Sequence, residues 1–146
     1  MIEASYPCYA AADKTQFVFQ SVGPKGIVIK VIRFEHIGSI RWNVGFGDFK
    51  KGQIDITVIS NNGDIVRILA TVAEAILVFL SEYPDRIVEV KPVDEKRKRL
   101  YNLTFSRRWE QVQEKVSITG LKGVFPEPYS PSEFYDSFEI TANFEV

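Results

Sequence analysis

The 146-residue sequence contains one cysteine and one histidine, and this scarcity excludes several chemistries. Cys8 has no second cysteine to pair with, so no disulfide can form within the chain. For the same reason, neither a cysteine-based zinc site nor an iron–sulfur cluster can be assembled. His36 likewise rules out a metal centre built from several histidines. We therefore expect no metal site of these kinds and no cofactor.

Excess charge and long apolar runs are also absent. The formal net charge is -1, which gives no global reason to expect a polyanion or a membrane surface as partner. The apolar stretch 65–80 is interrupted by Arg67 and Glu74 and is too short to span a bilayer. Residues 1–14 lack the basic and apolar regions of a signal peptide. The expectation is a cytoplasmic protein with no membrane partner.

What the sequence does contain is enough apolar material for a core. Hydrophobic residues make up 45% of the chain and aromatic residues 13%, and the length is typical of one domain. We find no internal repeat and no low-complexity tract. The sequence thus predicts a single domain covering residues 1–146.

Alternating and β-branched segments predict strands at both ends of the chain. A Gly23-Pro24-Lys25-Gly26 turn separates the first two strands. The segment 54–59 is apolar but less regular, so it is either a short strand or an extended lead-in. The predicted strands are 15–22, 27–34, 40–46, 86–91, 117–121 and 134–146.

Helical spacing of apolar residues predicts a central, largely buried helix over 64–83, with Asp64 as its N-cap and Pro84 after its end. A second helix is expected from Asp94 through 104, and a short third one at 108–115. The fold class is therefore α+β. We expect a mainly antiparallel sheet of five to seven strands, packed against the central helix and one or two further helices.

Three segments carry a family resemblance: SNNGDIVRILATVA at 60–73, YPD at 83–85 and RKRLY at 97–101. Through them the chain resembles a family of small bacterial proteins of unknown function. The resemblance also touches 42–49 and 117–121. It implies no particular activity, cofactor or partner.

Charge is unevenly distributed along the second half of the chain. Residues 91–108 hold seven basic and two acidic side chains, a balance of +5, whereas 109–146 have a balance of -5. A cationic helix beside Tyr101 and Trp109 is suited to a phosphate backbone or an acidic partner. The alternative is that the acidic segment packs near the basic helix, or that both are solvated faces. The candidate ligand-binding residues are Lys96, Arg97, Arg99, Tyr101, Arg107 and Arg108.

A second candidate site lies on the 86–91 strand. Asp85 followed by Glu89 and Lys91 is similar to the PD…ExK signature of a nuclease class, and Glu89 and Lys91 share one strand face. In such a site the carboxylates hold Mg²⁺ and the lysine orients the attacking water. Asp55 or Asp64 could take the place of Asp85. The alternative is a coincidental match.

The turn before the central helix has a third interpretation. Backbone N–H groups at a helix N-terminus attract anions, but the Asp64 carboxylate would occupy that place, and capping alone explains the turn.

The leading hypothesis for the function of the chain is a non-enzymatic binding or regulatory domain. It would contact an acidic protein or a phosphate-bearing ligand through the basic segment 96–108, and assembly into a homo-oligomer is left open. The alternative is a metal-dependent, nuclease-like hydrolase built on Glu89 and Lys91, with Asp64 as a further carboxylate.

Overall fold

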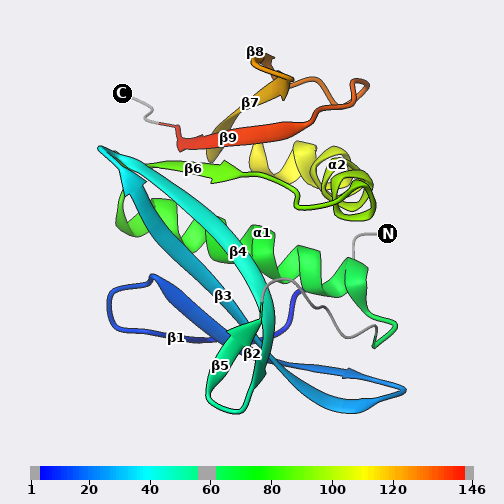
Figure 1. The fold of residues 1–146 in the computed structure, drawn as a ribbon. Coiled ribbons are helices and arrows are strands. Elements are labelled where there is room, and N and C mark those ends of the chain that lie inside the picture. The colour runs from blue at the N-terminus through cyan, green and yellow to red at the C-terminus, as the bar shows by residue number, and fades with distance from the viewer. Residues whose placement is uncertain (1–3, 56–61, 144–146) are drawn as a thin grey trace.

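The computed structural model describes residues 4–55 and 62–143. Their fold is α+β, as the sequence predicts, with two helices and one mostly antiparallel sheet (Figure 1). The helices are α1 (Ile65–Glu82) and α2 (Glu95–Val112). The strands are β1 (Tyr9–Ala10), β2 (Gln16–Gly23), β3 (Gly26–Gly38), β4 (Arg41–Lys50), β5 (Gln53–Asp55), β6 (Ile87–Val90), β7 (Val116–Lys122), β8 (Phe125–Pro128) and β9 (Ser137–Ala142).

The sheet runs in the order β1-β2-β3-β4-β6-β9-β7-β8, with β5 paired to β4. The hairpin between β2 and β3 closes at the predicted turn, where Gly23 pairs with Gly26. Gly26 has a φ of 84°, a conformation that residues with a Cβ rarely adopt. Only β4 and β6 pair in parallel among the described strands, and α1 lies between them in the sequence. This crossover places α1 against the sheet.

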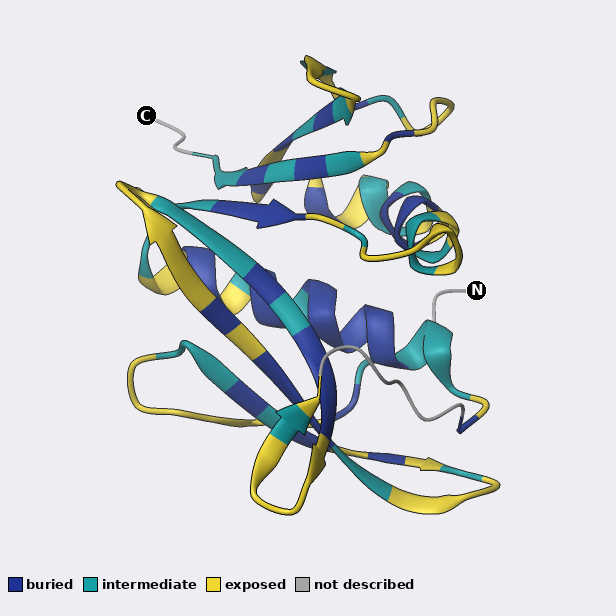
Figure 2. Ribbon diagram, in the orientation of Figure 1, coloured by how far each residue is buried: buried dark blue, intermediate teal, exposed yellow. Residues whose placement is uncertain are grey.

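Both helices pack on one face of the sheet. Phe79 of α1 stacks on Phe34 of β3 with ring centroids 4.2 Å apart, and Phe105 of α2 lies 4.6 Å from Phe138 of β9. Figure 2 shows α1 buried along most of its length, whereas α2 alternates between buried and exposed positions. The central position predicted for the first helix is therefore confirmed. Since α2 is exposed on one side, the charged residues on that side are accessible.

The structure corrects the predicted element list in three places. The sheet has more strands than the five to seven expected, because β1, β5 and β8 are too short to produce a clear periodic pattern. The two helices expected at 94–104 and 108–115 form one continuous helix, α2. The last strand is Ser137–Ala142, shorter than 134–146. Residues 56–59 of the looser apolar segment and 144–146 of the last strand lie outside the described residues.

In the described part of the chain, neither helix combines the length and the apolar composition that crossing a membrane would require.

Candidate functional site: the exposed face of α2

The sequence of α2 divides its residues between a buried and an exposed side. Asp94 caps the helix by accepting a hydrogen bond from the Arg97 N–H at 2.7 Å. The buried side carries Tyr101, Asn102, Thr104, Phe105 and Val112. Because these residues contact the core, the basic residues at the remaining positions are displaced towards the surface.

Three of the basic residues contact carboxylates of the chain itself. Arg108 donates to the Glu74 carboxylate of α1 at 2.7 Å, and its side chain is only 12% exposed. Lys98 contacts Asp136 at 2.5 Å, which raises the pKa of the lysine and lowers that of the aspartate. Arg97 lies 4.0 Å from Asp94. The acidic segment 109–146 thus packs near the basic helix at the Lys98–Asp136 contact, as one of the two alternatives from the sequence predicts.

Three other basic residues, Lys96, Arg99 and Arg107, are exposed. None of them forms an ion pair with a described residue. Their spacing along α2 places them on one side of the helix, together with Leu103, whose side chain is 40% exposed. The result is a stripe of three cations with an apolar residue among them, which we call the α2 stripe.

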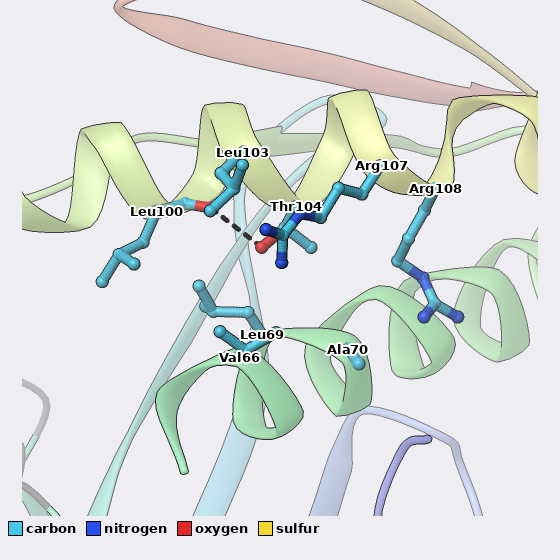
Figure 3. Close-up of a pocket in the computed structure, with 8 residues that line it drawn as sticks. All are labelled: Val66, Leu69, Ala70, Leu100, Leu103, Thr104, Arg107 and Arg108. Atoms are coloured by element: carbon cyan, nitrogen blue, oxygen red, sulfur yellow. Dashed lines mark hydrogen bonds between the residues drawn. The ribbon is translucent and has the colours of Figure 1, made fainter. Parts of the chain in front are cut away.

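A shallow apolar groove runs beside the α2 stripe, between the two helices (Figure 3). Its lining residues come from both helices, and its volume is about 20 Å³. The Thr104 hydroxyl donates to the Leu100 carbonyl at 2.8 Å, so its hydrogen-bonding capacity is used within the helix. The groove is lined by Val66, Leu69 and Ala70 of α1 and by Leu100, Leu103, Thr104, Arg107 and Arg108 of α2. It is thus an apolar depression with basic side chains at one end.

The structure places Tyr101 apart from the exposed stripe. The Tyr101 side chain is only 6% exposed, and burial raises its pKa. Trp109, the other aromatic residue expected beside the cations, packs on Tyr129 with ring centroids 4.9 Å apart. The six residues predicted as one ligand-binding set therefore separate. Lys96, Arg99 and Arg107 are exposed, Arg97 and Arg108 contact carboxylates, and Tyr101 is buried.

The residues of the nuclease hypothesis do not converge. Glu89 accepts from Arg41 at 3.0 Å and lies 3.8 Å from Lys91, and Arg41 also contacts Glu139 at 3.1 Å. Val88 and Val90 face the core, so Glu89 between them lies on the opposite face of the sheet from α1 and Asp64. Among the described residues, no three acidic, histidine or cysteine side chains are placed to hold a metal ion. Nuclease activity stays a prediction without a metal-binding geometry to support it.

Asp64 has a different role from the one predicted for it. It occupies the N-cap position of α1, but its side chain makes no capping hydrogen bond. Its carboxylate instead accepts from the Tyr6 and Ser21 hydroxyls, both at 2.5 Å. The neighbouring Asn62 donates to the Gly26 carbonyl and accepts from the Lys25 N–H. The turn therefore ties α1 to the N-terminal segment and to the β2–β3 hairpin, contacts that local sequence reasoning could not anticipate.

Sequence reasoning missed the contribution of α1 to the site. Val66 and Ala70 lie on the side of α1 that faces α2, and Glu74 neutralises Arg108. The available signal was the breadth of the apolar face of α1, which is wider than packing on a sheet alone requires. A wide apolar face indicates a second element packed against the helix.

Comparison with known proteins gives one match. A family model described as a family of unknown function, DUF6934, matches residues 3–143. The resemblance to a family of unknown function is thereby confirmed. No curated protein and no solved structure matches the chain significantly.

Proposed function

We propose a binding function for this chain, which belongs to the DUF6934 family of unknown function. In this proposal, an acidic protein segment with apolar side chains docks on α2. Its carboxylates meet the α2 stripe, and its apolar side chains pack on the exposed aliphatic surface around Leu103, beside the groove between α1 and α2. The protein acts as a recognition or regulatory domain and performs no chemistry on its partner.

The observation that carries the proposal is the α2 stripe itself. Lys96, Arg99 and Arg107 are exposed on one side of α2 and pair with no described carboxylate, although Arg108 and Lys98 on the same helix do. Like charges so placed repel one another modestly and are stabilised when a partner supplies the opposite charge. An acidic segment is the complement of this surface.

The groove favours a protein segment over a nucleic acid. A phosphate backbone is held by cations and hydrogen-bond donors and makes little use of an apolar depression. The groove is lined mainly by aliphatic side chains, and the Thr104 hydroxyl is already bonded to Leu100. An amphipathic segment matches both features, because its apolar side chains cover exposed aliphatic surface and its acidic ones contact the cations.

The length of the α2 stripe also suits a short partner segment. Lys96 and Arg107 are eleven residues apart on α2, which at the helical rise is roughly 16 Å. About three helical turns of a partner, or about five extended residues, span that distance. The Arg108–Glu74 contact joins α2 to α1 at one end of the groove and holds its shape.

Peptide display is the experiment that tests the proposal. Random peptides selected on the folded protein at low salt should be enriched in Asp and Glu, with one or two large apolar residues among them. Selection on the double variant Arg99→Glu/Arg107→Glu should lose this enrichment, because two attractive charges have become repulsive. Peptides with no acidic enrichment, or the same peptides from both selections, would contradict the proposal.

A further inference from the structure

Acidic residues continue the exposed side of α2 beyond the α2 stripe. Glu110 follows Arg107 at helical spacing and Glu114 follows Glu110 in the same way, so both lie on the side of the helix that carries Leu103. Glu114 is in the turn directly after α2, and both glutamates are exposed. One side of α2 therefore carries three cations followed by two carboxylates. None of the five has an ion-pair partner in the described part of the chain.

This order of charges is complementary to itself when a second copy of the helix runs in the opposite direction. With a two-fold axis midway between Arg99 and Glu110, Arg99 lies opposite Glu110 of the other copy. Lys96 then lies opposite Glu114, because these two residues are centred on nearly the same point of the helix. The two-fold axis produces each contact twice. A parallel pair would instead place Lys96 beside Lys96 and Arg99 beside Arg99, and these like charges repel.

The same alignment covers the exposed apolar residue of the α2 stripe. Leu103, whose side chain is 40% exposed, lies opposite Arg107 of the other copy. The aliphatic part of an arginine side chain packs on apolar surface while its guanidinium group stays in water. A contact between two single helices belongs to the small class of interfaces, below about 1,200 Å². The geometry therefore suits a weak dimer whose population rises with protein concentration.

We propose that the partner of the α2 stripe is a second copy of the chain, which docks through antiparallel packing of the two α2 helices. This inference rests on the proposed function, since it assigns the acidic partner segment to the C-terminal end of α2 in the other copy. Both complementary surfaces lie on one helix, so a single two-fold contact uses them all and closes the assembly as a dimer.

Sedimentation velocity at low salt, over a range of protein concentrations, tests the dimer. The parent protein should show a monomer–dimer equilibrium that added salt shifts towards the monomer. Arg99→Glu and Glu110→Lys should each raise the dissociation constant at least about tenfold, because each change makes two attractive contacts repulsive. The double variant Arg99→Glu/Glu110→Lys exchanges the charges of the pair. Its dissociation constant should return to within about threefold of the parent value, since the two residues are coupled.

Matched controls separate this contact from general effects of charge. Lys25→Glu and Glu82→Lys make the same changes at exposed positions outside α2, and both variants should dimerise like the parent. The proposal is overturned if the parent stays monomeric at every concentration, or if Arg99→Glu and Glu110→Lys dimerise unchanged. It is also overturned if the double variant dimerises no more tightly than the single variants.

Glu110→Lys also separates this inference from the proposed function. It adds a cation beside the α2 stripe, so it should not lower the affinity for the acidic peptides from the selection, although it weakens the dimer. A monomeric parent protein that still binds those peptides through the α2 stripe would overturn the second copy as partner and leave the proposed function intact. The absence of both the dimer and acidic-peptide binding would overturn both.

Discussion

Replacing Ile76 by alanine is expected to lower the free energy of unfolding by about 2–5 kcal/mol, the range for truncating a large buried aliphatic side chain. Ile76 lies in the middle of α1 and is 2% exposed. It belongs to the same core cluster as residues of both halves of the sheet and of α2, including Phe34, Phe105 and Ile140. The lost side chain therefore removes contacts that hold α1 against several elements at once. Chemical denaturation followed by circular dichroism measures the change.

Val78 provides the control for this substitution. It lies two residues further along α1, but its side chain is 41% exposed. Val78→Ala should change the free energy of unfolding by no more than about 0.5 kcal/mol, as is usual for surface positions. If Ile76→Ala also changed the free energy of unfolding by no more than about 0.5 kcal/mol, the buried face of α1 would be misassigned.

Replacing Asn102 by alanine is expected to cost about 2–4 kcal/mol, because it leaves two buried backbone groups without partners. The Asn102 amide accepts from the Tyr135 N–H at 2.9 Å and donates to the Tyr135 carbonyl at 2.8 Å. These bonds join α2 to the segment before β9, and Tyr135 itself is completely buried. Asn102 therefore fixes the position of the helix that carries the α2 stripe.

The matched control is Gln111→Ala on the same helix. Gln111 is exposed, and its replacement should leave the free energy of unfolding within about 0.5 kcal/mol of the parent. Equal stabilities of the Asn102→Ala and Gln111→Ala variants would mean that the Asn102 bridge contributes nothing to the position of α2.

The sequence predicted the elements whose signals are local. Helical spacing defined α1, and the glycines of the 23–26 turn defined the β2–β3 hairpin, because both depend on residues close in the chain. The short strands β1 and β8 depend on pairing with β2 and β7, so their own residues carry no periodic pattern. Asp64 shows the same limit. Its capping role was predicted from its neighbours, whereas its actual partners Tyr6 and Ser21 are distant in the sequence.

For the candidate site, the sequence could predict only that basic residues are in excess. The excess of basic residues on α2 is plain in the sequence, but which cations are neutralised depends on residues such as Glu74 and Asp136, far along the chain. The buried position of Tyr101 depends on how α2 packs against the sheet, for which the sequence has no local signal. Tertiary contacts thus separated exposed, ion-paired and buried residues within one predicted set.

Charge reversal on the α2 stripe tests the central claim most directly. An acidic, apolar peptide from the selection is titrated into the parent protein, into Arg99→Glu/Arg107→Glu, and into Lys25→Glu/Arg33→Glu. The last variant has the same change in net charge, made at exposed positions outside α2. We expect at least about a 30-fold loss of affinity for the α2 variant, since each close charge pair contributes about 1 kcal/mol or more. The control variant should lose less than about threefold in peptide affinity. Raising the salt concentration should narrow the difference in affinity between the parent protein and the α2 variant. Equal affinities of the two variants would contradict the claim that the peptide docks on α2.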